Sequence, residues 1–370
     1  MRIISLGYTT TASYDDPEAW LDRIDFYTGI LEKLALRHEV ESIEQINYEG
    51  QLERRGVRYH FINRSGSRYA HFRKLHRFVE RTRPDVVLVN GFIFPLQIIL
   101  LRRRLGRDAR IIVFHRSERP FTGIRRYAQR LADRCVNAYL FASPEFAKQW
   151  KHNIDTKKKV FEVVQASSRF MPIDRNEARR VTGMEGAPVF LWVGRLVARK
   201  DPLTVLKAFL QFVKENTGAR LYMIYQSEQM INDVKAMIAA AGKTGECVML
   251  VGSVPHDQLL YWYNSADFFL IASAYEGSGI SLTEALSCGC IPIVSDFVSF
   301  RAMTGNGRCG RMFPMGDAEG LLRIMQSIST FDIGAERSRA LQCFREELSF
   351  DAIAQKLERI IQPNGITQHE

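Results

Sequence analysis

The sequence has no apolar run long enough to cross a membrane. The longest run, Phe92 to Leu101, is interrupted by Pro95 and Gln97. It reaches about half of the roughly 20 residues that a spanning helix needs. The first ten residues, MRIISLGYTT, turn polar too early for the apolar region of a signal peptide. We therefore expect a cytoplasmic protein, with any membrane contact being peripheral and at the inner face.

Well-spaced pairs of cysteines are also absent. Of the six cysteines only Cys288 and Cys290 lie close together, whereas a structural zinc site needs two good ligand pairs. We expect reduced, mostly buried thiols. The dinucleotide fingerprint G-x-G-x-x-G is missing too, because residues 7–13 read GYTTTAS after the first apolar run. This excludes a nicotinamide-dependent dehydrogenase.

The composition is that of a globular protein, and its charge is uneven. Apolar residues make up 46% and charged residues 25% of the 370 positions, which excludes a disordered chain and favours two domains. The net charge is +10. Residues 51–150 carry 22 basic and 7 acidic side chains, whereas residues 1–50 carry 4 and 10. The excess positive charge therefore belongs to one stretch of the first half.

Short apolar runs alternate with helical patterns along both halves of the chain. In the first half the strands are predicted at 1–8, 57–62, 86–89, 110–114 and 138–142, and the helices at 22–37, 96–104 and 124–135. In the second half the strands are predicted at 189–193, 220–225, 247–251, 268–271 and 291–295, and the helices at 202–216, 229–241, 256–264 and 280–288. Three further helical segments follow, the last near 351–361. This alternation predicts a parallel sheet covered on both faces in each half.

Residues 151–185 are polar and irregular, with one short predicted strand at 160–164, and they are the expected interdomain connection. The pattern predicts an α/β protein with two Rossmann-like, doubly wound domains. We place them at 1–172 and 173–350, with a C-terminal helix and tail at 351–370 that packs back on the N-terminal domain. Ligands of such sheets bind beyond the carboxyl ends of the strands, so two facing sheets would place a ligand in the interdomain cleft.

Two segments of the second half carry groups suited to a diphosphate. The first follows a predicted strand, where Gly194 permits a sharp turn and Arg195 and Lys200 place two cations above the sheet edge. The second, residues 273–286, leads through Gly277 and Gly279 into a helix whose N-terminus suits an anion. Glu284 lies in the second turn of that helix and could bind a pair of ribose hydroxyls.

These segments together resemble the family-4 retaining glycosyltransferases of the GT-B fold. The resemblance rests on Gly194-Arg195 with Lys200, on Glu276 and Glu284 at a Glu-x7-Glu spacing, and on the following EALSCGCIP, over about residues 185–320. It implies an N-terminal acceptor-binding domain, a C-terminal nucleotide-sugar-binding domain, and neither a metal ion nor a cofactor beyond the donor. The donor-binding residues that it implies are Gly194, Arg195, Lys200, Ser278, Gly279, Ile280, Ser281 and Glu284.

The resemblance further implies two residues at the reacting centre. Glu276 would contact the donor sugar, although the sequence does not say whether as a nucleophile or as an orienting group. His115, which follows the predicted strand at 110–114, would lie close to the same sugar. The chain departs from the family pattern at residues 7–13, 225–228 and 297–301, where glycine-rich turns are missing. These departures concern the donor base and the acceptor more than the transfer chemistry.

The implied partners are a nucleotide-sugar donor and a glycan or lipid-linked acceptor, as in surface polysaccharide or glycolipid synthesis. The arginine-rich residues 102–134 predict either a solvated face, an anionic membrane contact or an anionic acceptor sugar. Two alternatives stay open: a catalytically silent relative that binds a sugar nucleotide, and a protein that binds polyanions or nucleic acid. Nucleic acid is not an expected partner, because the second half would then have no use for its phosphate-binding pattern.

Overall fold

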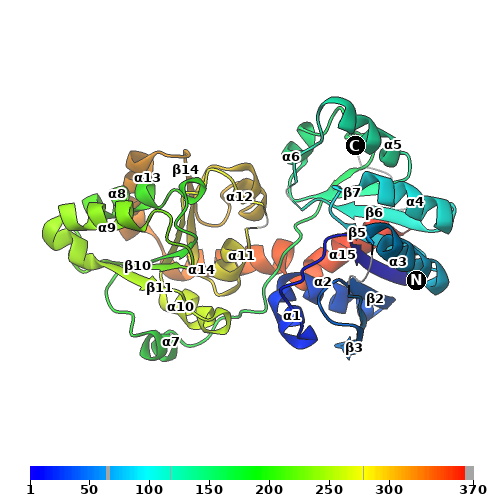
Figure 1. The fold of residues 1–370 in the computed structure, drawn as a ribbon. Coiled ribbons are helices and arrows are strands. Elements are labelled where there is room, and N and C mark those ends of the chain that lie inside the picture. The colour runs from blue at the N-terminus through cyan, green and yellow to red at the C-terminus, as the bar shows by residue number, and fades with distance from the viewer. Residues whose placement is uncertain (64–66, 117, 278, 363–370) are drawn as a thin grey trace. The chain divides into compact units, whose positions relative to one another are not determined.

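The structure is a computed structural model that describes residues 1–63, 67–116, 118–277 and 279–362. The chain divides into two compact units (Figure 1). Unit 1 comprises Met1–Ser167 together with Phe350–Glu370, and unit 2 comprises Ser168–Ser349. All six cysteines are free thiols, as the sequence predicts. No helix in the described part of the chain is long and apolar enough to span a bilayer.

Unit 1 is built on an eight-stranded sheet of order β3-β4-β2-β1-β5-β6-β7-β8. All neighbours pair in parallel except β3 with β4, which are antiparallel at one edge. The strands are β1 (Arg2–Gly7), β2 (Glu39–Glu44), β3 (Gly50–Arg54), β4 (Val57–Phe61), β5 (Val86–Asn90), β6 (Arg110–Phe114), β7 (Ala138–Phe141) and β8 (Val160–Glu162). The helical segments are α1 (Pro17–Arg23), α2 (Asp25–Ala35), α3 (Arg68–Thr82), α4 (Pro95–Leu105), η1 (Gly123–Arg125), α5 (Arg126–Asp133), α6 (Pro144–Lys148) and α15 (Phe350–Ile361).

The C-terminal helix α15 is part of the core of unit 1. It lies beside α2, more than 300 residues away in sequence, as Figure 1 shows. Its apolar face, including Ile353, Leu357 and Ile361, is buried in the same cluster as β1 and β5. The ring of Phe350 takes the place that a side chain would fill at Gly29. The fold of unit 1 therefore depends on a segment that follows unit 2 in the sequence.

Unit 2 contains a six-stranded, all-parallel sheet of order β11-β10-β9-β12-β13-β14. Numbered within the unit this is 3-2-1-4-5-6, the Rossmann order. The strands are β9 (Val189–Gly194), β10 (Arg220–Tyr225), β11 (Val248–Gly252), β12 (Phe268–Ile271), β13 (Ile291–Ser295) and β14 (Arg311–Phe313). The helical segments are α7 (Arg175–Thr182), η2 (Ala198–Lys200), α8 (Pro202–Phe212), α9 (Ile231–Ala240), η3 (Gly242–Cys247), η4 (His256–Gln258), α10 (Leu259–Ser265), α11 (Ile280–Ser287), α12 (Val298–Met303), α13 (Ala318–Ser327), η5 (Ile328–Thr330), α14 (Ile333–Cys343) and η6 (Phe344–Leu348).

The sequence prediction of two Rossmann-like, doubly wound α/β units is confirmed. The start of α8 shows how local the signal can be. Asp201 caps the helix, with its carboxylate accepting from the Thr204 amide at 3.3 Å and the Thr204 hydroxyl at 2.7 Å, and Pro202 takes the first helical position. Proline has no backbone N–H, and the first position of a helix needs none, so the cap and the proline favour the same helix start.

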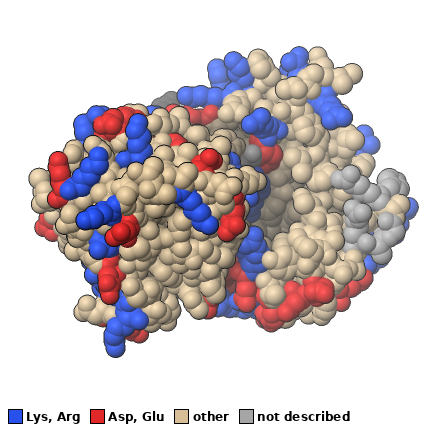
Figure 2. All heavy atoms as spheres, turned by 60° about the vertical axis from the view of Figure 1, so that its left-hand side comes forward, with Lys and Arg blue, Asp and Glu red and all other residues tan. Residues whose placement is uncertain are grey.

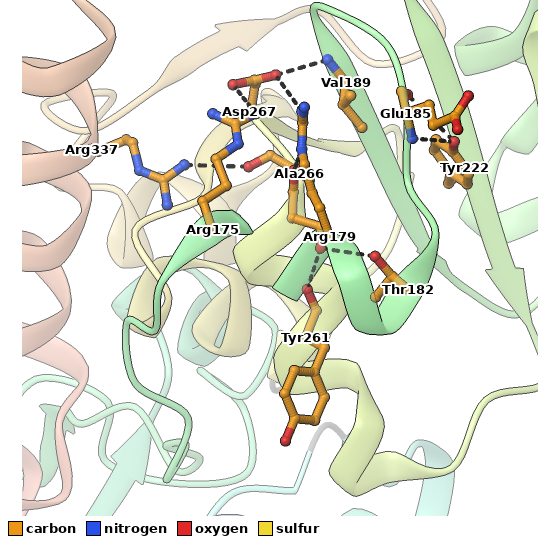
Figure 3. A network of polar contacts seen from close by, with 11 residues as sticks. Arg175, Arg179, Thr182, Glu185, Val189, Tyr222, Tyr261, Ala266, Asp267 and Arg337 are labelled. Carbon is orange, nitrogen blue, oxygen red and sulfur yellow. Dashed lines mark hydrogen bonds and ion pairs between the residues drawn. The ribbon is translucent and has the colours of Figure 1, made fainter. Parts of the chain in front are cut away.

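A polar network fastens α7, which the sequence analysis did not predict, to the sheet of unit 2 (Figure 3). The carboxylate of Asp267, just before β12, accepts from the Val189 amide at 2.8 Å. It also pairs with Arg175 at 2.5 Å and lies 3.8 Å from Arg179, both on α7. Arg337 of α14 donates to the Ala266 carbonyl at 3.3 Å. This network lies at the amino ends of β9 and β12 and leaves their carboxyl ends for a ligand.

Candidate active site

The two phosphate-type loops follow neighbouring strands at the centre of the unit 2 sheet. β9 and β12 are paired, and the order of the strands reverses between them. Residues 195–200 follow β9, and residues 272–279 follow β12. The carboxyl ends of two such strands form the crevice in which doubly wound sheets bind their ligands. The predicted donor-binding segments therefore meet at the one point of this sheet where a binding crevice is expected.

The loop after β9 begins at Gly194, where any larger residue would be crowded. A Cβ at this position would lie 3.1 Å from the indole of Trp192. The following Leu196 is buried, and its backbone bonds to Ser227 (3.2 Å) and Met230 (3.0 Å) in the segment after β10. This backbone pairing holds the loop in place while the side chain of Arg195 stays exposed. The exposed guanidinium is thus free to reach an anion.

Lys200 and Glu276 form an ion pair that joins the two loops. Their side chains are 14% and 13% exposed, so both charges are largely withdrawn from water. The Glu276 carbonyl also accepts from the Ser299 hydroxyl at 2.9 Å, which fixes the second loop. The sequence analysis assigned Lys200 to the donor diphosphate and Glu276 to the donor sugar. The structure places the two groups in direct contact, where each lowers the cost of burying the other.

The second loop turns into α11 at Gly279, which has a left-handed backbone with φ of 57°. A Cβ there would be 2.5 Å from the sulfur of Met303, so glycine fits for both conformational and steric reasons. Ile280 and Ser281 form the first turn of α11 and are half-buried. The first N–H groups of a helix have no acceptor within it and carry its positive dipole end, so they suit an anion. Ser278, also predicted to bind the donor, lies outside the described residues.

Glu284 is buried, with both carboxylate oxygens engaged. Oε1 pairs with Nε2 of His256 at 2.7 Å, and Oε2 accepts from the hydroxyl of Tyr263 at 2.9 Å. Burial and the neighbouring carboxylate raise the pKa of Tyr263 well above its usual range, which keeps this hydroxyl a donor. The ring of Phe170 lies 5.2 Å from that of His256. The predicted ribose-binding carboxylate is thus oriented by two side chains, one from η4 and one from α10.

His115 is the one predicted site residue that lies in unit 1. It follows β6, stacks on Phe141 with the ring centroids 4.3 Å apart, and meets the edge of Trp150. Its Nε2 donates to the Glu118 carbonyl at 2.9 Å, since a carbonyl can only accept. Desolvation by burial lowers the pKa of His115, so the imidazole is neutral near pH 7. Within unit 1 this histidine is held firmly by an aromatic cluster.

The sequence analysis did not identify a cavity of about 360 Å³ at the carboxyl ends of β1 and β5 in unit 1. Here too the order of the strands reverses. The guanidinium of Arg116 lies 4.5 Å above the ring of Tyr27 and donates to the Asn90 side-chain oxygen at 3.2 Å. Glu44 accepts from the Trp20 indole at 2.9 Å, and burial raises its pKa. Aromatic rings beside amide and carboxyl groups suit a ligand that is rich in hydroxyls.

Comparison with known proteins links these loops to sugar transfer. Residues 174–339, a little under half of the chain and including both loops, match the family model described as "Glycosyl transferases group 1". A solved glycosyltransferase from Rickettsia africae ESF-5 superposes with a TM-score of 0.74 at 14% identity, covering 100% of this chain and 99% of that one. Anabaena Alr3699/HepE, solved with UDP, gives 0.71 at 13% identity over 98% and 99%. The chain has the GT-B fold.

This GT-B chain is also similar in sequence to glycosyltransferases whose roles are known. The amylovoran biosynthesis glycosyltransferase AmsK of Erwinia amylovora is 26% identical over 182 residues, which cover 46% of this chain and 44% of the relative. The lipopolysaccharide core biosynthesis mannosyltransferase LpsB of Rhizobium meliloti (strain 1021) is 25% identical over 229 residues, covering 57% and 59%. The matches thus span about half the length of each relative.

Three residues that orient the site carry no recognisable sequence signal. Phe170 lies in the segment predicted to be a connection, and His256 and Tyr263 lie on segments chosen only for their helical pattern. Their importance comes from contacts across 28, 21 and 86 positions of the chain. Within the described residues, no group of three or more His, Cys, Asp or Glu side chains is arranged to hold a metal ion.

Proposed function

We propose that this chain is a retaining glycosyltransferase of family 4. It moves a hexosyl or N-acetylhexosaminyl group from a nucleoside diphosphate sugar to the hydroxyl of a glycan or lipid-linked glycan precursor. The observation that carries this proposal is the Lys200–Glu276 pair beside the Gly279 turn, at the point of the sheet where ligands bind and inside the matched range. The relatives act in polysaccharide and lipopolysaccharide synthesis, which supports a glycan acceptor.

The donor diphosphate would be held by Arg195, Lys200 and the backbone amides of Gly279, Ile280 and Ser281. Breaking the bond between the sugar and the diphosphate leaves negative charge on the leaving phosphates. Fixed cations and helix N–H groups stabilise that charge, and one such contact is typically worth about 2.7–4 kcal/mol of barrier. These groups would take the role that a metal ion plays in other transferases, so we propose transfer without a metal.

Glu276 would act at the reacting carbon, because it touches the lysine that we assign to the diphosphate. When the donor binds, the phosphates would share Lys200 with this carboxylate. Glu284 would bind the ribose hydroxyls through the remaining lone pairs of its two oxygens. The acceptor would be held by unit 1, whose cavity offers Asn90, Gln45 and Glu44 as hydroxyl partners. Glu118, to whose carbonyl His115 donates, also lines this cavity.

The donor can be identified before the acceptor. A ligand that binds only the folded state of a protein raises the melting temperature of that protein. A thermal-shift panel of nucleoside diphosphates and their sugars should therefore single out one base. Release of that nucleoside diphosphate should then require an acceptor extract and yield a product with the donor's anomeric configuration. Binding without release under every acceptor would instead identify a silent sugar-nucleotide-binding protein.

Tyr263→Phe is expected to raise the KM for the donor about tenfold and to leave kcat nearly unchanged. The change removes one hydrogen bond to a charged group, worth about 1.5–3 kcal/mol, and loosens Glu284. Tyr261→Phe is the matched control on the same helix, with its side chain half-buried. Initial rates at varied donor concentration measure both constants. An equal fall in kcat, or an equal effect of the control, would contradict the assignment of Glu284 to the ribose.

A further inference from the structure

Helix α5 of unit 1 presents its apolar side to the solvent. Ile124, Tyr127 and Leu131 recur at spacings of three and four residues, so they share one face of η1 and α5. They are 85%, 56% and 51% exposed. The residues that α5 buries are Gln129 and Ala132. An ordinary surface helix buries its apolar stripe and exposes its polar side, so this orientation is reversed.

Hydrogen bonds of Gln129 explain why this polar residue of α5 faces inward. They give no role to the apolar side chains that face outward. The Gln129 amide donates to the Phe92 carbonyl at 3.0 Å, and its oxygen accepts from the Phe121 amide at 2.9 Å and from Asn153 at 2.7 Å. These bonds fix the rotation of the helix. The exposed apolar side chains are therefore held outward by a buried network.

Helix α4 packs against α5 and continues the exposed apolar surface. Leu96 is 61% exposed and Leu100 is 39% exposed. A hollow of about 600 Å³ opens beside Leu96, lined mostly by apolar side chains including Phe94, Pro95 and Phe121, with Gln97 and Arg125 as its polar members. Contiguous exposed apolar surface of this kind marks an interaction site.

The arginines of residues 102–134 are of two kinds, which the sequence could not separate. Arg102 donates to the carbonyls of Gly106, Ala109 and Cys135, and Arg110 donates to the carbonyls of Ile361 and Gln362. These arginines hold the fold together. Arg104 pairs with Glu80 at 2.8 Å, and Arg116 lies over Tyr27 in the cavity of unit 1.

The second kind of cation borders the apolar stripe. Arg125, Arg130 and Arg134 are exposed, and none of the three has an ion pair in the described part of the chain. A second hollow, of about 500 Å³, brings Arg130 and Arg134 together with Lys151 and His152. Its two acids are already engaged, since Asp133 pairs with Lys159 and Asp155 accepts from backbone amides. In Figure 2 Lys and Arg gather at the upper end of unit 1, where Figure 1 places α4 to α6, and Asp and Glu gather at its lower end.

We propose that this α5 face, made of Leu96, Leu100, Ile124, Tyr127, Leu131, Arg125, Arg130 and Arg134, docks on an anionic phospholipid bilayer. The apolar side chains enter the boundary between headgroups and acyl chains, and the arginines contact the phosphates. The combination favours a lipid surface, because interfacial helices pair an apolar side with flanking cations. A nucleic acid would use the cations and leave Ile124 and Leu131 without a role. Docking would bring the enzyme of the proposed function to a lipid-linked acceptor. Docking itself does not depend on sugar transfer.

The test is co-sedimentation of the full chain with vesicles, without donor or acceptor. The wild type should bind vesicles of equimolar phosphatidylglycerol and phosphatidylcholine, should not bind pure phosphatidylcholine, and should bind less at high salt. Arg125→Ser, Arg130→Ser and Arg134→Ser together should weaken binding roughly 100-fold, since each cation near the surface contributes about a fivefold step. Ile124→Ser with Leu131→Ser should weaken it to a similar degree, and Ile124→Trp should strengthen it.

Matched controls separate docking from general charge and folding. Lys207→Ser, Lys214→Ser and Lys235→Ser remove the same charge from exposed positions of unit 2, and Leu36→Ser removes an apolar side chain that is 75% exposed elsewhere in unit 1. These should bind as the wild type does. Equal binding to both vesicle types, no binding, or equal losses in the controls would overturn the proposal. So would self-association of the wild type that Ile124→Ser abolishes, because the face would then be a protein interface. The thermal shift with nucleoside diphosphate tests the proposed function separately in every variant.

Discussion

Lys200→Ala is expected to lower kcat about 100-fold or more, and Arg195→Ala to have an effect of the same order. Each change removes a fixed cation from the developing charge on the leaving phosphates, which is worth about 2.7–4 kcal/mol of barrier. The two differ in structural setting, because Lys200 is largely buried against Glu276 and Arg195 is exposed. We therefore expect Lys200→Ala to lower the melting temperature as well, since it leaves a carboxylate without its partner.

Arg199→Ala is the control, because it removes an exposed cation from the same loop. It should keep turnover close to that of the wild type. The measurement is the initial rate at saturating donor, with folding checked by the melting temperature of each variant. Turnover within threefold of the wild type in both Lys200→Ala and Arg195→Ala, with a verified donor, would refute the assignment of these cations to the diphosphate.

Deletion of residues 350–370 is expected to unfold unit 1 while unit 2 stays folded. The deletion removes α15, whose Phe350, Ile353, Leu357, Ile360 and Ile361 are buried. Burial of side chains of this size stabilises by about 1.5–3 kcal/mol each, or about 7.5–15 kcal/mol for the five together. A typical domain has a free energy of unfolding of about 5–15 kcal/mol, so unit 1 should not survive the loss.

Limited proteolysis with mass spectrometry distinguishes the units. The deletion variant should give a resistant fragment close to residues 168–349 and should lose all fragments from residues 1–167. The control ends at Gln362, which keeps α15 and the carbonyls to which Arg110 donates. It should digest as the full chain does. Survival of an intact fragment from residues 1–167 in the shorter chain would show that unit 1 does not need α15.

Two of the elements that sequence reasoning missed, β2 and α3, bury polar side chains whose partners lie far along the chain. β2 reads EVESIE, yet Glu41 is buried because it pairs with His60 of the neighbouring strand at 2.6 Å. Helix α3 buries His71 and His76, so its inward side looks polar. The nitrogen of His76 meets the hydroxyl of Tyr8 at 2.9 Å. Such positions can be recognised as buried only once their hydrogen-bond partners are known, and these partners lie 19 and 68 residues away in the sequence.

The candidate site likewise contains residues that the sequence could reveal and contacts that it could not. Gly194, Asp201 and Gly279 could be recognised locally, because a turn, a helix cap and a left-handed residue each depend on the residue itself. The pairing of Lys200 with Glu276 could not, because 76 positions separate them and only the adjacency of β9 and β12 brings them together.

The sequence by itself determined the fold class and the two loops, since apolar periodicity and glycine position act over a few residues. It also located the positive charge in residues 51–150. Only the tertiary structure decided what that charge can do. Burial turned Arg102, Arg110 and Arg116 into internal hydrogen-bond donors and left Arg125, Arg130 and Arg134 exposed beside an apolar stripe. The physical reason is that an arginine's role depends on which carbonyls and rings the fold brings to it, and most of these lie far along the chain.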